Sequence, residues 1–273
     1  MTTGPTPNSE IGAVPPREWD ARAYHTVAEP QFEWGKRVLS TLELRGDEVA
    51  MDAGCGTGRL TTLLAERIPR GVVVGVDRSE NMIRVAAETL GPLGSRATVV
   101  LADLSSLPFR AAFDVVFSTA TFHWILDHDA LFASVYGSLK AGGVLHAQCG
   151  GTTNLERIHR RARALTETPV FAPMFIRWRT PSYHADAETT RQRLQRTGFD
   201  SIETNLEPAP VVFPSAEAFA TFVSTVVLRP FLALISDERL RKSFVAQITE
   251  AAAGDSPAYE LDYCRLNIRA RRP

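Results

Sequence analysis

Cysteine is scarce in this sequence of 273 residues, and its three copies are widely scattered, at Cys55, Cys149 and Cys264. They form neither the even-numbered set of a disulfide framework nor the paired Cys-x-x-Cys spacing of a zinc site. His, Asp and Glu show no cluster with ligand spacing either. We therefore expect no metal site, and we expect a protein of the reducing cytoplasm.

An excess of one charge and long apolar runs are also missing. Thirty Lys and Arg stand against 31 Asp and Glu, a formal net charge of -1. Such a chain has no overall field that would attract DNA, RNA or an anionic membrane surface. No stretch approaches the roughly 18 apolar residues that a membrane span needs. Residues 1–17 are polar and proline-rich, so we expect them to be disordered, and we expect neither a nucleic-acid nor a membrane partner.

Short apolar runs alternate with helical patterns from residue 48 onward. Buried parallel strands read as continuous apolar runs, and βαβ units alternate them with amphipathic helices. Such runs occur at 48–54, 71–77, 97–103, 112–120 and 142–150, and two further strand candidates follow at 201–213 and 262–272. The pattern predicts an α/β fold with a mostly parallel sheet.

The regular alternation is interrupted in three places, which we interpret as additions to one domain. Residues 18–42 contain helical pieces before the first strand, residues 152–183 lose the regular pattern, and residues 215–252 form a helical insert. We expect a single domain over 18–273, in which these three segments form a lid over the site.

The stretch MDAGCGTGRL contains glycines at 54, 56 and 58 directly after the first apolar run. A dinucleotide fingerprint would place its third glycine at position 59, where Arg59 stands, so a pyrophosphate ligand is disfavoured. Asp77 and Asp103 end the next two strands. Because ligands of open α/β sheets bind at the carboxyl ends of strands, these acids and Asp52 should converge on one nucleotide-like ligand.

Five motifs in sequence identify the family that this chain resembles. DAGCGTG, VDRSENM, LADLSSLPF, FDVVFSTATFHWI and LKAGGVL resemble, in order and spacing, those of class I S-adenosylmethionine-dependent methyltransferases. The resemblance implies an enzyme with S-adenosylmethionine as cofactor. It also implies a Rossmann-like, seven-stranded sheet with helices on both faces and the last strand antiparallel.

The same resemblance implies the cofactor contacts. The three glycines would frame the methionine part, Asp77 would hold the ribose hydroxyls and Met82 would pack on the adenine. Asp103 and the Leu104 amide would contact the edge of the base, and Ser118, placed after the fourth strand, would contact the methionine end through its backbone. The predicted cofactor-binding residues are therefore Asp52, Gly54, Gly56, Gly58, Asp77, Met82, Asp103, Leu104 and Ser118.

Nucleic-acid bases are poor candidates for the methyl acceptor. Enzymes that methylate base amines carry Asn or Asp followed by Pro-Pro and an aromatic residue after the fourth strand, whereas this chain has Ser-Thr-Ala-Thr at 118–121. A Pro-Cys pair for pyrimidine carbon chemistry is missing too. The arginines in ERIHRRAR, residues 156–163, could bind phosphate, but we interpret them as a solvated helix face.

Three segments more closely resemble the trans-aconitate methyltransferase group, which esterifies small carboxylic acids. They are WDARAYHTVAEPQFEWG, FHWI and TVVLRPFL, at 19–35, 122–125 and 225–232. CGGTTN at 149–154 departs from that group, which leaves the acid open. A carboxylate has a pKa of about 4 and is already nucleophilic at neutral pH, so it needs only to be positioned.

The acceptor is accordingly expected to be a small molecule held by a few named residues. Arg229 would clamp a carboxylate, Trp124 would form an apolar wall and Tyr24 would close the pocket. His123 would donate to the acceptor, or act as base if the acceptor were a phenol. Two alternatives stay open: methylation of carbon, nitrogen or a phenol, and a protein that binds S-adenosylmethionine without turnover.

Overall fold

Residues 18, 21–22 and 29–273 are described by the computed structural model. The segment expected to be disordered, 1–17, and the predicted pocket residue Tyr24 lie outside the described residues. Among the helices of the described residues, none is long and apolar enough to cross a membrane.

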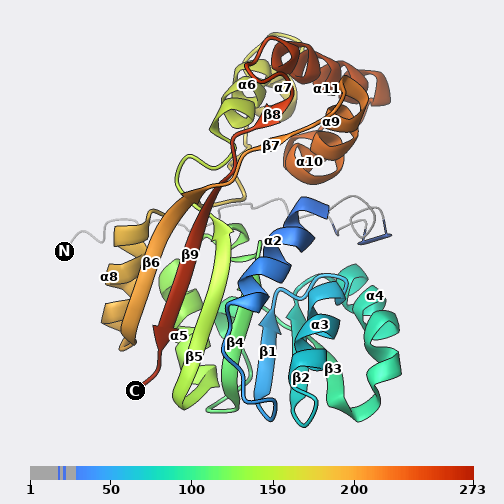
Figure 1. The fold of residues 1–273 in the computed structure, drawn as a ribbon. Coiled ribbons are helices and arrows are strands. Elements are labelled where there is room, and N and C mark those ends of the chain that lie inside the picture. Colours follow the sequence, from blue (N-terminus) through green and yellow to red (C-terminus); the bar gives the residue numbers. More distant parts are fainter. Residues whose placement is uncertain (1–17, 19–20, 23–28) are drawn as a thin grey trace, which may run out of the picture.

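Seven strands form one sheet in the order β3-β2-β1-β4-β5-β9-β6 (Figure 1). All neighbours are parallel except β9, which runs antiparallel to both β5 and β6. The predicted Rossmann-like sheet with an antiparallel last strand is thereby confirmed. The strands are β1 (Val49–Ala53), β2 (Val72–Asp77), β3 (Ala97–Leu101), β4 (Phe113–Thr119), β5 (Leu139–Gly150), β6 (Asp200–Pro208) and β9 (Cys264–Arg271).

Helices cover both faces of the sheet because its strands are apolar on both sides. Ala50 packs into the core on the side of α2 and α3, whereas its neighbour Met51 packs into the core on the side of α5 and α8. This alternation follows from the two-residue repeat of a strand. One face carries α2 (Glu29–Ser40), α3 (Arg59–Arg67) and α4 (Glu80–Leu90), and the other carries α5 (His128–Ser138) and α8 (Ala187–Thr197).

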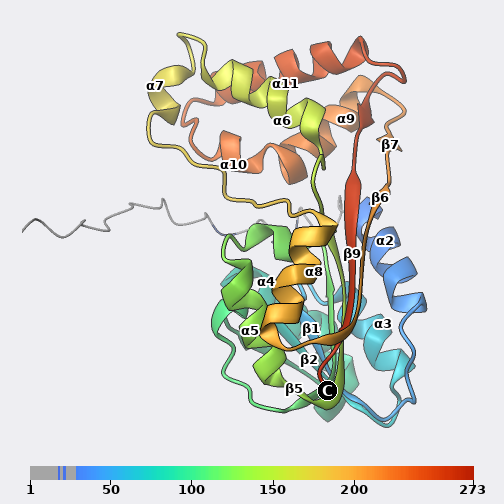
Figure 2. The ribbon, with the colours of Figure 1, turned by 90° about the vertical axis from the view of Figure 1, so that its left-hand side faces the viewer.

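A second group of helices, here called the cap, stands above the carboxyl ends of the parallel strands (Figures 1 and 2). It is formed from two of the three segments that the sequence singled out, 152–183 and 215–252. Its elements are α6 (Glu156–Thr166), α7 (Ala172–Phe175), α9 (Ala216–Phe222), the π-helical η4 (Val223–Val227), α10 (Arg229–Leu232) and α11 (Glu238–Ala253).

The cap has a hydrophobic core of its own. Large side chains from its helices pack together, among them Phe171, which meets the ring of Phe244 edge-on at 5.1 Å between centroids. Trp34 of α2 joins this core, while Val38 and Leu39, one turn further along the same helix, pack on the sheet. The third segment singled out by the sequence thus bridges the cap and the sheet.

Over residues 29–273 the chain passes between sheet and cap four times, and all four passages lie beside β5, β9 and β6 (Figure 1). It rises from β5 into α6, returns from α7 to α8, rises from β6 into β7 (Val211–Val212), and returns from β8 (Glu260–Leu261) into β9. The strands β7 and β8 pair antiparallel and continue β6 and β9 into the cap. The sequence did not reveal this short ribbon.

The arginines of α6 correct one interpretation from the sequence. Arg161 donates to both carboxylate oxygens of Asp255, at 2.8 and 2.6 Å, and Arg157 donates to Glu260 at 2.5 Å. The exposed fractions of the Arg157 and Arg161 side chains are 26% and 24%. The interpretation as a solvated helix face was therefore wrong for these two residues, which fasten α6 to the rest of the cap.

The glycine-rich turn after β1 follows a backbone path that favours glycine. Gly54 and Gly56 have φ angles of 83° and 54°. A Cβ atom on Gly54 would lie 2.1 Å from Thr121 Oγ1, whereas a Cβ atom on Gly56 would meet no atom within 4 Å. Gly54 therefore permits a close contact with the segment after β4, and Gly56 borders open space.

We predict that alanine at these two positions has different effects on stability. Gly56→Ala incurs only the left-handed backbone strain, about 1–2 kcal/mol. Gly54→Ala adds the displacement of Thr121, for a total of about 2–5 kcal/mol. Urea unfolding without cofactor measures both losses, and equal losses would contradict the assigned contact.

Candidate active site

A cavity opens where the four strands β1 to β4 end, at the edge predicted from the sequence. We call it the strand-end cavity. Its walls come from the ends of these strands and from the turns that follow them, which is where open α/β sheets bind ligands. The lining residues are Gly54, Gly56, Asp77, Arg78, Met82, Asp103, Leu104, Thr119, Ala120, Thr121, Trp124 and Ile125.

Asp77 is held in this cavity by backbone amides. Its Oδ2 accepts from Gly56 N at 3.0 Å, and its Oδ1 accepts from Ser79 N at 2.9 Å. Burial raises the pKa of the Asp77 carboxyl, against the lowering effect of the amides of Ser79 and Gly56. Each oxygen keeps a further lone pair, so the carboxylate can accept from two neighbouring hydroxyls.

Three more predicted residues line the same cavity. Met82 and Leu104 are almost fully buried, and the Oδ1 atom of Asp103 accepts from Ser105 N at 2.8 Å, capping the short helix η2 (Leu104–Ser106). The structure thus brings together an acid from each of two strand ends and two apolar side chains, an arrangement that suits a flat ring with a polar edge.

A second cavity, the α2 cavity, lies beneath helix α2 and shares Gly54, Gly56, Thr119 and Ala120 with the first. Asp52 lines it and accepts from Thr61 Oγ1 at 2.7 Å. Burial raises the pKa of Asp52 to about 7, and the nearby Asp77 charge acts in the same direction. The remaining lining residues are Gln31, Phe32, Cys55, Thr57, Arg59 and Leu60.

Two of the predicted cofactor residues line neither of these cavities. Gly58 precedes α3 and lies against α4, where an added Cβ would come within 3.3 Å of Ala86 Cα. Ser118 lies inside β4 rather than after it, and its hydroxyl donates to Ala53 O at 2.6 Å. The predicted placement of Ser118 was wrong because β4 runs to Thr119, so that the next residues line the cavity instead.

A third cavity, the cap cavity, lies between the strand ends and the cap. It meets the strand-end cavity at Ala120 and Trp124. Both belong to the segment after β4, where Phe122–Trp124 form a short 3-10 helix, η3. The lining consists of Gln31, Ala120, His123, Trp124, Asn154, Leu155, His159, Ser182, His184, Val226, Val227, Tyr263 and Arg265.

His123 is buried in the wall of the cap cavity and accepts a hydrogen bond from the chain. The Gly150 amide donates to its Nδ1 atom at 3.2 Å. Burial lowers the pKa of His123 well below its usual range, with the charges of His184 and Arg265 adding to the effect. The ring is therefore neutral, with its proton on Nε2, and can donate from that atom.

Two further histidines continue from His123 in a row. Its ring lies 5.6 Å from that of His184, which stacks on His159 at 5.8 Å. Burial lowers the pKa of both His159 and His184 to about 4. Their rings stack instead of converging, and across the described residues no group of three or more His, Cys, Asp or Glu is placed to hold a metal ion.

Arg229 lies away from the described lining of all three cavities. It begins α10 and is in the electrostatic range of Glu18 and Arg78, the latter a residue of the strand-end cavity. Burial lowers the pKa of Arg229, against the effect of Glu18. Glu18 in turn accepts from Ser79 Oγ at 2.5 Å. The predicted clamp thus approaches the side on which β2 ends.

Sequence reasoning missed several residues of the cap cavity. His159 comes from α6, His184 from the segment before α8, and Arg265 from the start of β9. The predicted direction of the last strand could have identified Arg265 as a residue near the site. An antiparallel last strand must begin at the edge where the parallel strands end, so its first residues face the site.

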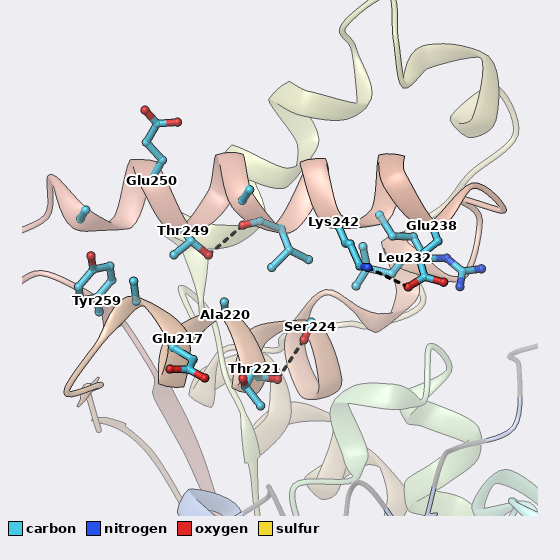
Figure 3. Close-up of a pocket in the computed structure, with 15 residues that line it drawn as sticks. Glu217, Ala220, Thr221, Ser224, Leu232, Glu238, Lys242, Thr249, Glu250 and Tyr259 are labelled. Atoms are coloured by element: carbon cyan, nitrogen blue, oxygen red, sulfur yellow. Dashed lines mark hydrogen bonds and ion pairs between the residues drawn. The ribbon is translucent and has the colours of Figure 1, made fainter.

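A larger groove lies on the cap between α9 and α11 (Figure 3) and shares no lining residue with the three cavities. Polar groups of the groove interact within their own helix: Lys242 forms an ion pair with Glu238 at 3.2 Å, and Thr249 Oγ1 donates to Val245 O at 2.9 Å. Because these groups do not converge on a common point, the groove lacks the features of a catalytic site.

Comparison with known proteins identifies the family. A family model described as a methyltransferase domain matches residues 50–143. The chain is 32% identical over 209 residues to malonyl-[acyl-carrier protein] O-methyltransferase of Geobacter sulfurreducens, covering 76% of each protein. It is 27% identical over 272 residues to trans-aconitate 2-methyltransferase of Acidovorax ebreus, covering 93% of this chain and 98% of that protein.

A solved structure supports the fold. Haemonchus contortus phosphoethanolamine N-methyltransferase 2, in complex with phosphomonomethylethanolamine and S-adenosylhomocysteine, is similar with a TM-score of 0.61 and 19% identity, covering 93% of this chain and 57% of that chain. The prediction of an enzyme that uses S-adenosylmethionine is confirmed. The chain belongs to the class I S-adenosylmethionine-dependent methyltransferases and is related to their trans-aconitate 2-methyltransferase branch.

Proposed function

We propose that this small-molecule methyltransferase esterifies a free carboxylate of an acid bound in the cap cavity. The observation that carries the proposal is the state of His123, whose Nδ1 accepts from the Gly150 amide, leaving the ring proton on Nε2. In that tautomer His123 donates and does not remove a proton. This state of His123 suits a reaction in which the nucleophile is already ionised and needs no base.

The strand-end cavity and the α2 cavity fit the two ends of S-adenosylmethionine. The adenosine would occupy the strand-end cavity, with Asp77 accepting from the ribose and Asp103 from the base, while Met82 and Leu104 pack on the ring. Gly56 borders both cavities, and a Cβ there would point into open space that the cofactor would fill. When bound, the cofactor supplies an electrophilic methyl group on a sulfonium.

The methionine end would lie in the α2 cavity. Asp52 stands there as a carboxyl that can pair with an ammonium group, and Arg59 as a guanidinium that can pair with a carboxylate. The reacting methyl group would then lie near Ala120, which lines all three cavities.

The cap would act as a lid over this meeting point. Trp124 lines both the strand-end cavity and the cap cavity, and Val226 and Val227 cover the cap cavity from above. These apolar walls would keep water from the sulfonium and hold the carboxylate oxygen in line with the methyl group. Orientation of this kind can contribute about 7–11 kcal/mol to the lowering of a barrier.

Methylation of a phenol is less compatible with these residues. The histidines beyond His123 have pKa values of about 4. Taking a proton from a phenol of pKa about 10 would be uphill by about six pK units, on the order of 8 kcal/mol. The names of two relatives also describe carboxyl acceptors, a malonyl group in one and trans-aconitate in the other.

The first test asks whether the product is an ester. We expect a methyl-labelled cofactor and a pool of small acids, phenols and amines to give product whose label is released as methanol by mild base. Asp77→Asn, expected to bind cofactor weakly, serves as the matched control. Base-stable label would contradict the proposal, because it would mean that the methyl group is attached to carbon, nitrogen or phenolic oxygen.

The second test separates donation from base catalysis at His123. Asn places an amide oxygen close to the position of Nδ1, so His123→Asn keeps the bond from Gly150 and loses only the donor at Nε2. We expect kcat to fall by no more than about tenfold, the worth of one neutral hydrogen bond. A loss of about 100-fold or more, together with the disappearance of an acid limb that the unmodified protein shows in its pH profile of kcat, would instead mark a general base.

The third test uses the raised pKa of Asp52. Because that pKa is about 7, the carboxyl is mostly protonated at pH 6 and ionised at pH 8.5. Pairing with the cofactor's ammonium favours the ionised form, so binding should release close to one proton at pH 6 and close to none at pH 8.5. Titration calorimetry in buffers of different ionisation enthalpy measures the release.

Asp52→Asn should abolish this proton release, whereas the surface variant Asp129→Asn should retain it. The Asp129 side chain is 63% exposed, forms ion pairs with Arg193 and Arg196, and is not among the residues that line the α2 cavity. If Asp52→Asn released as many protons as the unmodified protein, another group would be responsible and Asp52 would not face the ammonium.

A further inference from the structure

The groove between α9 and α11 is a feature that the proposed function does not use (Figure 3). It has a volume of about 960 Å³. The residues of α11 that line it recur three or four positions apart and so form one face of the helix, among them Lys242, Val245, Ala246, Thr249, Glu250 and Ala253. The opposite face packs into the cap core through Phe244, Ile248 and Ala252. One whole face of α11 therefore borders the groove.

The middle of the groove is lined by small and apolar side chains. Ala220 and Thr221 contribute from α9, and Val245, Ala246 and Thr249 contribute from α11. Ala246 is exposed. Small side chains at a contact let two helix axes approach to about 8–10 Å. The groove therefore has the shape and the lining to receive a further helix laid along it.

The two ends of the groove differ in charge. Glu217 and Glu250 lie at one end, and Arg241 and Lys242 lie at the other, together with Glu238 (Figure 3). Lys242 pairs with Glu238 at 3.2 Å, but the two side chains are 78% and 74% exposed, so this pair is weak and can be exchanged for another. The groove thus has a net negative end and a net positive end.

The charges of α11 are arranged symmetrically about Ala246. Lys242 precedes Ala246 by four residues and Glu250 follows it by four residues. Four residues advance an α-helix by about 6 Å. Two antiparallel copies of α11 that cross at Ala246 would therefore place Lys242 of each copy opposite Glu250 of the other. A parallel arrangement in the same register would instead place like charges together.

We propose that the groove is the interface of a homodimer, in which α11 of each copy packs antiparallel against α11 of the other about a two-fold axis at Ala246. A two-fold interface uses the same patch on both copies, so the patch must be complementary to itself. A groove with opposite charges at equal distances from a small central residue meets this condition. An occupant with charge of one sign would be attracted at one end and repelled at the other.

The first measurement is the mass of the full chain in solution. One chain has a mass of 30.0 kDa, and the proposed dimer has twice that mass. Sedimentation equilibrium from about 1 to 100 µM, a range that covers interfaces of modest affinity, should show the mass rising toward that of the dimer. The mass of a single chain throughout this range would overturn the inference and leave the groove to a different protein.

Exchanging the charges tests the antiparallel register. Lys242→Glu makes both ends of the groove acidic and Glu250→Lys makes both ends basic, so each variant should self-associate with a Kd roughly 10–100-fold weaker. An equal mixture of the two variants restores both pairs and should dimerise within a few-fold of the unmodified protein. Glu66→Lys, an exposed change on α3 outside the groove, is the matched control and should have no effect.

Cross-linking locates the two-fold axis. In Ala246→Cys the two introduced thiols face each other across the axis, so a short bis-maleimide should join the two chains. Ala253 is exposed on the same helix but lies seven residues from the axis, which separates its two copies by about 20 Å. Ala253→Cys should therefore remain unlinked. The three native cysteines are buried, and the unmodified protein serves as the background control.

Each other outcome contradicts the inference. A dimer that neither single charge variant weakens would use another surface. Two weakened variants that do not recover when mixed would exclude the antiparallel register, and equal cross-linking of Ala246→Cys and Ala253→Cys would exclude the axis. These measurements need no methyl transfer. Because the groove shares no lining residue with the three cavities, the dimer and the proposed function can each fail without the other.

Discussion

The reversal of one strand is the constraint on which this site depends. β9 enters the sheet antiparallel between β5 and β6, so it begins where its parallel neighbours end. A parallel strand in the same slot would bring its last residues to this edge instead. The reversal places Arg265 in the wall of the cap cavity and lets β8 and β9 run directly from the cap into the sheet.

Local sequence was sufficient to predict residues that line the strand-end cavity, because these residues lie at or just after strand ends in the chain. Asp77 and Asp103 each follow an apolar run directly, so the strand ends and their acids could be read together, and both line the strand-end cavity. The prediction that Ser118 follows the fourth strand was wrong because β4 continues to Thr119. Strand boundaries depend on pairing with neighbours, which an apolar run alone does not fix.

The acceptor side could be predicted less well because it assembles from distant segments. His159, His184 and Arg265 lie in three separate parts of the chain, and only the packing of the cap on the sheet brings them together. Resemblance drew attention to Arg229 through the segment TVVLRPFL, whereas the described lining of the cap cavity contains the buried Arg265 and not Arg229. A sequence motif shows which residues a chain shares with its family, whereas the residues that line a cavity show which chemical groups this particular chain presents there.

The four passages between sheet and cap have a mechanical consequence. In the described part of the chain they all lie beside β5, β9 and β6, and the far side, above β2 and β3, has none (Figure 1). The described backbone connections therefore join the cap to the sheet along one edge, and helix α2 adds a packing contact through Trp34. The cap cavity is lined by residues of three of these four passages, whereas the described lining of the strand-end cavity includes none of them, so the two cavities differ in how directly the backbone links their walls to the cap.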